Sequence, residues 1–372
     1  MYIVISDVHL GHIKVNSETI YAKLVNQLYP HLADCKGLFI AGDFFDQLIT
    51  MDGPGAQYAA CIMQELIQLA EKYQFFIRIL RGTFGHDRNQ LKIFETLAAY
   101  SSNINLKYFD SITIESINNN NDLKVLYIPD SLPFKSTAEV MKYIHNLLKV
   151  NELKKVDLVI GHGYFEHVLP KAAVAHTKII FTYEMFKDIV NGFIVFGHVH
   201  THSAYKNILY CGSFDRLNHG EEEAKGFLKL ERTPEWKCTF IKNKESTPFI
   251  TIKINESIDQ LESILQSLPD KVSKKMDISF GHLRLIVDTQ ELKIALLSRI
   301  PYLFPKLNVT IKVTDGSPDE PVTFNSEMFE SIELGDVPTP ETLTDDIFNF
   351  LTQYRPESTL TKELIQEKIN SL

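Results

Sequence analysis

Cysteine is scarce in this chain. Only four of the 372 residues are cysteines, and no two of them are close enough to form a Cys-x-x-Cys motif. This spacing excludes a thiolate zinc site of the ribbon or finger type and argues against a disulfide framework. We expect reduced, mostly buried thiols, as in proteins of a cytosolic compartment. The cysteines are Cys35, Cys61, Cys211 and Cys238.

A surplus of basic residues is also lacking. The chain has 38 Lys and Arg against 47 Asp and Glu, which gives a formal net charge of −9. Such a charge provides no general electrostatic attraction for nucleic acid, so any nucleic-acid binding has to use a local basic surface. A nuclease is not excluded, but a partner that supplies affinity for DNA becomes more plausible.

Long hydrophobic runs are missing as well. No run approaches the roughly 18 apolar residues of a membrane span, so we expect no membrane association. The apolar N-terminus has no basic leader and is interrupted at Asp7, which favours a β-strand over a signal peptide. A soluble, cytoplasmic protein of a bacterial or viral system is the expectation.

Five apolar runs, each ending in Asp or His, are the main positive feature of the sequence. Each reads as a buried strand whose carboxyl end leads into a loop, and in open α/β sheets ligands bind at that edge. Carboxylates and imidazoles without thiolates suit divalent Mn, Fe or Zn. The runs are residues 1–6, 37–42, 75–82, 156–161 and 192–197, followed by Asp7-Val8-His9, Asp43, His86-Asp87, His162 and His198-Val199-His200.

The spacing within these clusters is compatible with metal binding. Asp7 and His9 lie two apart on a segment expected to be extended, so both side chains would point to one side. His198 and His200 repeat this spacing, and Asp43, after two small residues, could bridge two cations. A single histidine is usually a packed or surface residue, whereas five such clusters in one chain indicate a common site.

Strands and helical segments alternate in the first part of the chain, which predicts a layered α/β domain over residues 1–232. Residues 233–315 contain a β-α-β-α-β pattern without a metal-ligand cluster, as expected of a small α+β domain that selects substrate. Residues 316–340 are acidic and proline-containing, as in a linker. Residues 341–372 predict two short amphipathic helices, which either pack on their own domain or dock a partner helix.

The order of the motifs resembles the calcineurin-like metallophosphoesterase superfamily. Within it, the chain is most similar to the SbcD-type exonucleases and endonucleases of DNA repair and recombination, over about residues 1–232. This resemblance implies a β-sandwich flanked by helices, a DNA-selecting cap domain, and C-terminal helices that dock an SMC-like ATPase of the SbcC type. Homodimerisation through helices of the first domain is also implied as a possibility.

The same resemblance implies a site with two divalent cations, most plausibly Mn²⁺. Together the cations would activate a water molecule and clamp the scissile phosphate of DNA. His86 would protonate the leaving oxygen, with Asp87 orienting its imidazole. Contacts with the DNA backbone are expected from His12, Arg81 and Arg88, although His12 reads more simply as a surface histidine. The first metal would be held by Asp7, His9, Asp43 and His200, and the second by Asp43, His162 and His198.

One position departs from the family pattern. The superfamily normally has Gly-Asn-His-Asp, with Asn binding the second metal, but here Gly85 precedes His86. The second site would then be completed by water, by a backbone carbonyl, by Thr83 or by Asn89, and we expect an active enzyme with an asymmetric metal pair.

Further alternatives concern neighbouring residues and the function itself. Asp46 and Gln47 are expected to support Asp43, and residues 221–223 (three glutamates) read as an exposed turn. Besides a DNA nuclease, the motifs would suit a phosphodiesterase or phosphatase for small nucleotides or phosphoproteins. A non-catalytic scaffold with a weakened metal site is the third alternative.

Overall fold

A computed structural model describes residues 1–53, 55–99, 105–117, 122–169, 177–314 and 361–362. The chain divides into two units, Met1–Gly316 and Ser317–Leu372. The linker predicted for residues 316–340 lies outside the described residues, as do the helices predicted for 341–372 except for Thr361 and Lys362. Among the helices described, none combines the length and apolar character needed to cross a membrane.

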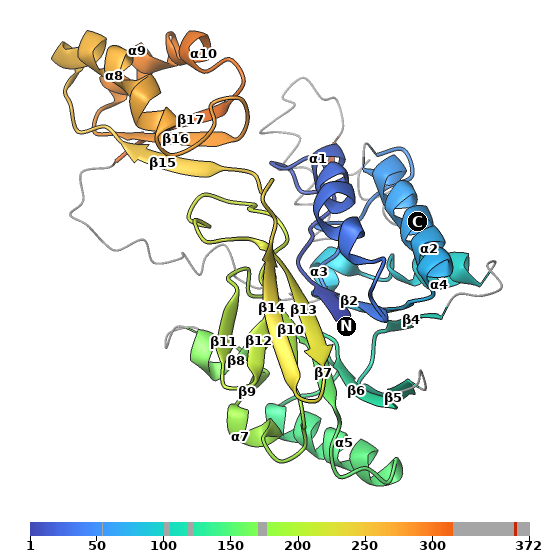
Figure 1. The fold of residues 1–372 in the computed structure, drawn as a ribbon. Coiled ribbons are helices and arrows are strands. Elements are labelled where there is room, and N and C mark those ends of the chain that lie inside the picture. The colour runs from blue at the N-terminus through green and yellow to red at the C-terminus, as the bar shows by residue number, and fades with distance from the viewer. Residues whose placement is uncertain (54, 100–104, 118–121, 170–176, 315–360, 363–372) are drawn as a thin grey trace. The chain divides into compact units, whose positions relative to one another are not determined.

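The first sheet has six strands in the order β14-β13-β1-β2-β3-β4 (Figure 1). Strands β1 to β4 run parallel to their neighbours, whereas β13 pairs antiparallel with both β1 and β14. Because β14 belongs to this sheet, the sheet continues past residue 232. The strands are β1 (Tyr2–Ile5), β2 (Gly37–Ala41), β3 (Phe76–Leu80), β4 (Leu106–Phe109), β13 (Gly226–Arg232) and β14 (Trp236–Lys242).

The second sheet also has six strands, in the order β11-β12-β10-β7-β6-β5. Its central strands β6, β7, β10 and β12 are parallel, and β5 and β11 close the edges as antiparallel strands. A separate pair, β8 (Tyr164–Phe165) and β9 (Ile180–Phe181), is parallel. The six strands are β5 (Thr113–Ile117), β6 (Leu123–Ile128), β7 (Leu158–His162), β10 (Ile194–Gly197), β11 (Ser203–Tyr205) and β12 (Ile208–Tyr210).

Side chains from both sheets form one shared core, for example Val4 and Phe39 from the first and Tyr127 and Ile160 from the second. The other face of the first sheet packs on α1 (Ser17–Lys23), α2 (Ala56–Tyr73) and α4 (Lys92–Ala98). The other face of the second packs on α5 (Thr137–Val150) and α7 (Tyr183–Phe186). The predicted α/β class is confirmed.

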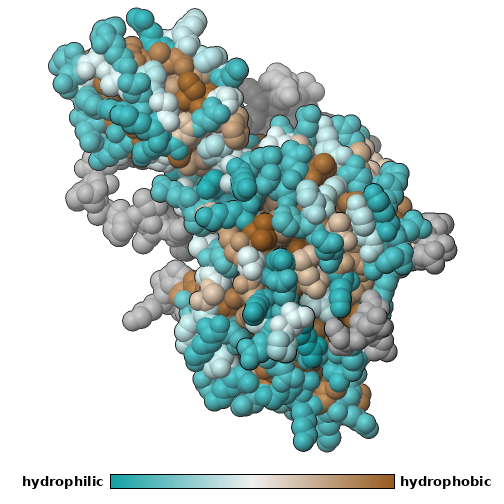
Figure 2. Space-filling model, in the orientation of Figure 1, coloured by the Kyte–Doolittle hydropathy of each residue, from teal (hydrophilic) through white to brown (hydrophobic). Residues whose placement is uncertain are grey.

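Burial on both faces explains the continuous apolar runs. Every residue of β1, β2, β3, β7 and β10 is buried, as is typical of parallel strands covered on two sides. Short helical turns complete this region: η1 (Leu24–Leu28), η2 (Tyr29–His31), α3 (Phe84–Asp87) and η3 (Glu166–Val168). The face of the molecule in Figure 2 is mostly hydrophilic, with scattered hydrophobic residues.

Residues 249–313 form the predicted β-α-β-α-β pattern. The strands β15 (Phe249–Lys253), β16 (His282–Val287) and β17 (Asn308–Val313) are parallel and enclose their own apolar core with the helices. None of the groups of potential metal ligands found among the described residues lies in this segment. Its helices are η4 (Ile258–Gln260), α8 (Leu261–Ser273), α9 (Gln290–Leu297) and α10 (Ile300–Leu303).

Candidate metal centre

The loops that follow β1 and β2 run side by side at the carboxyl edge of the first sheet. The amide of Asp7 donates to the carbonyl of Gly42 (3.1 Å), and the amide of His9 donates to the carbonyl of Asp43 (3.1 Å). Asp7 and His9 both have φ of 51°, so neither has an extended backbone and the expectation of an extended segment was wrong at these two residues. Asp43 (φ 49°) and His198 (φ 87°) also have positive φ. Such backbone conformations are uncommon outside glycine and concentrate at functional sites.

The first cluster of ligand atoms comprises Asp7, His9 and His200, whose side chains each offer one atom within 4.8 Å of the others. The Nε2 atoms of His9 and His200 are 3.1 Å apart, and His200 Nε2 lies 3.9 Å from Asp7 Oδ1. Two imidazole nitrogens turned toward one another beside a carboxylate suit a divalent cation of the Mn, Fe or Zn type. The donor set therefore fits a metal ion.

The second cluster comprises Asp43, His162 and His198. His162 Nε2 lies 3.2 Å from both Asp43 Oδ2 and His198 Nδ1. Burial raises the pKa of the Asp43 carboxyl, but the adjacent His162 outweighs it, with His9 and His86 adding to the effect, and the pKa falls below its usual range. Asp43 is therefore an anion suited to a cation. Burial and the proximity of His162 lower the pKa of His198 to about 4, which leaves it a neutral ligand.

The two clusters adjoin one another. The amide of His198, from the second cluster, donates to both carboxylate oxygens of Asp7, from the first, at 3.0 and 3.1 Å. Asp43 lies with the second cluster, and its charge interacts with His9 of the first. A bridging role for Asp43 stays a prediction.

Thr83 occupies the second cluster, whereas Gly85 does not reach it. The Thr83 amide donates to Asp43 Oδ1 (2.6 Å), and its hydroxyl lies 3.1 Å from Asp43 Oδ2 and 3.3 Å from His198 Nδ1. A Cβ atom at Gly85 would meet nothing within 4 Å. Thr83, one of the alternatives for completing this site, thus lies in contact with two of its candidate ligands.

Asp87 does not orient His86, and that expectation was wrong. The fully buried Asp87 carboxylate accepts hydrogen bonds from the amides of Asp43 (2.9 Å), Phe45 (3.0 Å) and Gly82 (2.8 Å). Burial and the nearby Asp43 carboxylate raise the pKa of Asp87 to about 7. Its role is to fasten the loops after β2 and β3 to each other.

The imidazole of His86 is held by backbone. Its Nδ1 donates to the carbonyl oxygen of Asp46, and its ring lies edge-on to His9 with centroids 4.9 Å apart. The Asp46 carboxylate lies 3.0 Å from His9 Nδ1, so it orients a ligand of the first cluster and does not support Asp43 as expected. A carboxylate on the outer nitrogen of a histidine fixes the tautomer that presents Nε2 to a metal.

Glu221 supports His200 in the same way, which sequence reasoning missed. Its Oε1 lies 3.2 Å from His200 Nδ1 and its Oε2 lies 2.9 Å from the buried Nζ of Lys225. Burial raises the pKa of Glu221, but the His200 and Lys225 contacts outweigh it and lower the pKa to about 2. The expected exposed turn was wrong at this position, because the partner of Glu221 is 21 residues away in the sequence.

The substitution Glu221→Gln should weaken Mn²⁺ binding about 10- to 100-fold, because His200 loses the carboxylate that fixes its tautomer. Isothermal titration calorimetry with Mn²⁺ measures the change. Glu222→Gln is the matched control, since Glu222 is exposed and its side chain has no hydrogen bond within the described residues, where its backbone carbonyl accepts one from Arg216. Equal Mn²⁺ affinity of the two variants would contradict this role of Glu221.

The three residues expected to touch DNA differ in their surroundings. The guanidinium of Arg81 donates to the carbonyls of Asp130 (3.1 Å) and Ser131 (3.4 Å), so it is engaged within the protein. Arg88 is exposed. His12 is half-buried, its Nδ1 accepts from the amides of Lys14 and Val15, and burial lowers its pKa to about 4. His12 is therefore a neutral residue.

Comparisons with known proteins add little to this geometry. Neither a scan against protein-family models nor a search of curated proteins finds a match. One solved structure, whose title reads "Crystal structure of", has 17% sequence identity and a TM-score of 0.34, covering 65% of this chain and 98% of its own. A likeness at that level carries no functional argument.

Proposed function

We propose that this chain is a metal-dependent phosphodiesterase that hydrolyses DNA. The observation that carries the proposal is the pair of adjoining clusters, Asp7–His9–His200 and Asp43–His162–His198, with His86 beside them. Divalent cations held by these residues would supply an activated water molecule and compensate the charge of the phosphate. Mixed oxygen and imidazole donors are consistent with Mn²⁺.

The protein itself orients the histidines that would bind metal, and it transfers a proton. Asp46 and Glu221 set the tautomers of His9 and His200, so both rings turn Nε2 toward the cluster. His86 binds the Asp46 carbonyl through Nδ1, which leaves Nε2 as the atom able to protonate a leaving oxygen. No covalent intermediate with the protein is required.

DNA as substrate, and an ATPase as partner, are the finer part of the proposal. They are supported by the sequence resemblance to SbcD-type nucleases and by the net charge of −9, which makes a partner useful for DNA affinity. Residues 341–372, outside the described residues, are proposed to dock an SMC-like ATPase.

The test is cleavage of labelled linear duplex and single-stranded DNA with Mn²⁺. His86→Ala should lower the rate by about 10²- to 10⁴-fold, the usual range for loss of a general acid. His145→Ala is the matched control, because His145 lies on α5 and bonds the Met141 carbonyl. Hydrolysis of a generic phosphodiester without hydrolysis of DNA would contradict DNA as the substrate. Hydrolysis of neither would contradict the proposal that the chain is an enzyme.

A further inference from the structure

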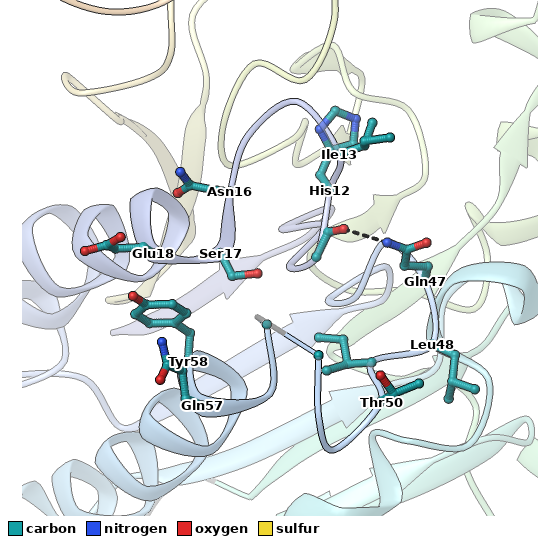
Figure 3. Close-up of a pocket in the computed structure, with 14 residues that line it drawn as sticks. His12, Ile13, Asn16, Ser17, Glu18, Gln47, Leu48, Thr50, Gln57 and Tyr58 are labelled. Atoms are coloured by element: carbon teal, nitrogen blue, oxygen red, sulfur yellow. Dashed lines mark hydrogen bonds between the residues drawn. The ribbon is translucent and has the colours of Figure 1, made fainter.

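A cavity of about 520 Å³ lies next to the loops that carry the candidate metal ligands. Figure 3 shows the side chains that line it. It lies between the loops that follow β1 and β2 and the first turns of α1 and α2. Its volume falls within the range of small-molecule sites in proteins. The side chains labelled in Figure 3 come from all four of these segments: His12, Ile13, Asn16, Ser17, Glu18, Gln47, Leu48, Thr50, Gln57 and Tyr58.

Two loops connect this cavity with the metal clusters. Gly11 and His12 follow His9 by two and three residues along the first loop, and Gln47 follows Asp46, whose carboxylate holds the His9 ring. Gln47 Nε2 also donates to the Gly11 carbonyl (3.0 Å), which joins the loops at the edge of the cavity. A ligand in the cavity and a group at the metal centre would therefore contact the same two loops.

The polar groups of the cavity are hydroxyls and carboxamides. Ser17 is only 7% exposed, yet its hydroxyl makes no hydrogen bond within the described residues and points into the cavity in Figure 3. Because Ser17 lines the cavity, a ligand there can reach this hydroxyl and hydrogen-bond it. The side chains of Thr50 and Gln57 likewise have no hydrogen bond within the part of the chain that the structure describes.

The charge of the lining argues against a phosphate. Among the described residues that line the cavity there is no lysine or arginine, and the charged side chain is the acidic Glu18. An uncharged ligand with several donors and acceptors suits these walls better than an anion.

The walls also offer flat and apolar surfaces. Tyr58 is half-buried, and its ring is backed by Tyr21 at a centroid distance of 5.8 Å. At the mouth of the cavity, Ile13 and Leu48 are 90% and 49% exposed. An aromatic ring next to carboxamides is the combination with which proteins stack and hydrogen-bond unpaired bases.

We propose that this cavity holds an unpaired nucleobase of a single DNA strand whose neighbouring phosphodiester lies at the metal centre. The base stacks on Tyr58, and its polar edge meets Ser17 and Gln57. This inference rests on the proposed function and specifies its substrate as a strand with at least one unpaired nucleotide. A base within a duplex is stacked and paired, and would have to leave the stack before it could enter.

Binding measured without metal tests the proposal. A fluorescein-labelled single strand of thymidines and an abasic strand of the same length are titrated with the full chain in a chelator, and anisotropy is recorded. The wild type should prefer the thymidine strand about tenfold or more, the range that stacking of one base provides. Tyr58→Ala should abolish this preference and Tyr58→Phe should keep it, while Tyr143→Ala, an exposed tyrosine on α5, is the matched control.

Equal binding of the two strands by the wild type would overturn the proposal, as would an undiminished preference in Tyr58→Ala. If Tyr58→Ala does not fold, Gln57→Ala on the exposed side of the same turn is the second variant, and it too should reduce the preference. Because the binding measurement contains no metal, its result does not depend on whether the chain hydrolyses DNA. Conversely, an active nuclease without base preference would retain the proposed function and remove this inference.

Discussion

Asp43→Asn is expected to remove almost all Mn²⁺-dependent phosphodiester hydrolysis. The asparagine keeps the shape of Asp43 but removes the negative charge beside His162. Loss of an outer partner of a metal ligand already costs about 10- to 100-fold, so loss of a ligand's charge should cost on the order of 10³-fold. Steady-state hydrolysis of a chromogenic phosphodiester measures the loss of activity, and titration with Mn²⁺ measures the loss of metal affinity.

A matched control is Asp34→Asn, because Asp34 is exposed and lies outside every group of potential metal ligands among the described residues. Thermal unfolding of the metal-free Asp43→Asn variant shows whether it is folded. Hydrolysis by a folded Asp43→Asn variant at the wild-type rate would contradict the assignment of Asp43 as a ligand.

Glu115→Gln is expected to lower the free energy of unfolding by about 3 kcal/mol, because it leaves the buried guanidinium of Arg78 without its counter-ion. Arg78 on β3 is 1% exposed, and its Nε and Nη2 donate to the two carboxylate oxygens of Glu115 on β5 at 2.7 and 2.8 Å. The pair therefore joins the two sheets. Urea unfolding followed by circular dichroism measures the loss.

The pH dependence of stability gives an independent check. Burial raises the pKa of Glu115, but the Arg78 and Lys107 contacts outweigh it and hold the pKa below the ordinary value of 4.5. A depressed pKa in the folded state contributes stability above the ordinary pKa, and this contribution is lost as the pH falls below it. The wild type should lose more stability than Glu115→Gln on acidification, and parallel pH profiles would contradict the pairing.

The strands and the clusters of candidate ligands were predictable from sequence because their signals are local. Parallel strands buried on both faces need unbroken apolar runs, and four of the five runs here lead directly into residues of the two ligand clusters. Asp7, His9, His162 and His198 were thus found from the pattern alone. Their grouping into two adjoining trios follows from the shared carboxyl edge of the sheets.

The partners of these ligands were not predictable, since they depend on contacts between distant loops. Glu221 reaches His200 only because the loop before β13 folds back, and the motif next to His86 suggested Asp87 where the structure uses the Asp46 carbonyl. Thr83 was one of several alternatives until its contacts with Asp43 and His198 were known. The spacing of residues shows which ones are close along the chain. It carries no information about contacts between distant loops.

At the candidate ligands, the left-handed backbone lowers the stability of the fold at the same positions whose side chains could bind metal. Asp7, His9 and Asp43 have φ near +50° without being glycine, and a left-handed conformation costs an L-residue about 1–2 kcal/mol. Glycine would relieve that cost at each position but would remove a ligand. A sequence optimised for thermal resistance alone would therefore diverge first at these positions, so variants selected only for heat tolerance are expected to lose metal binding there.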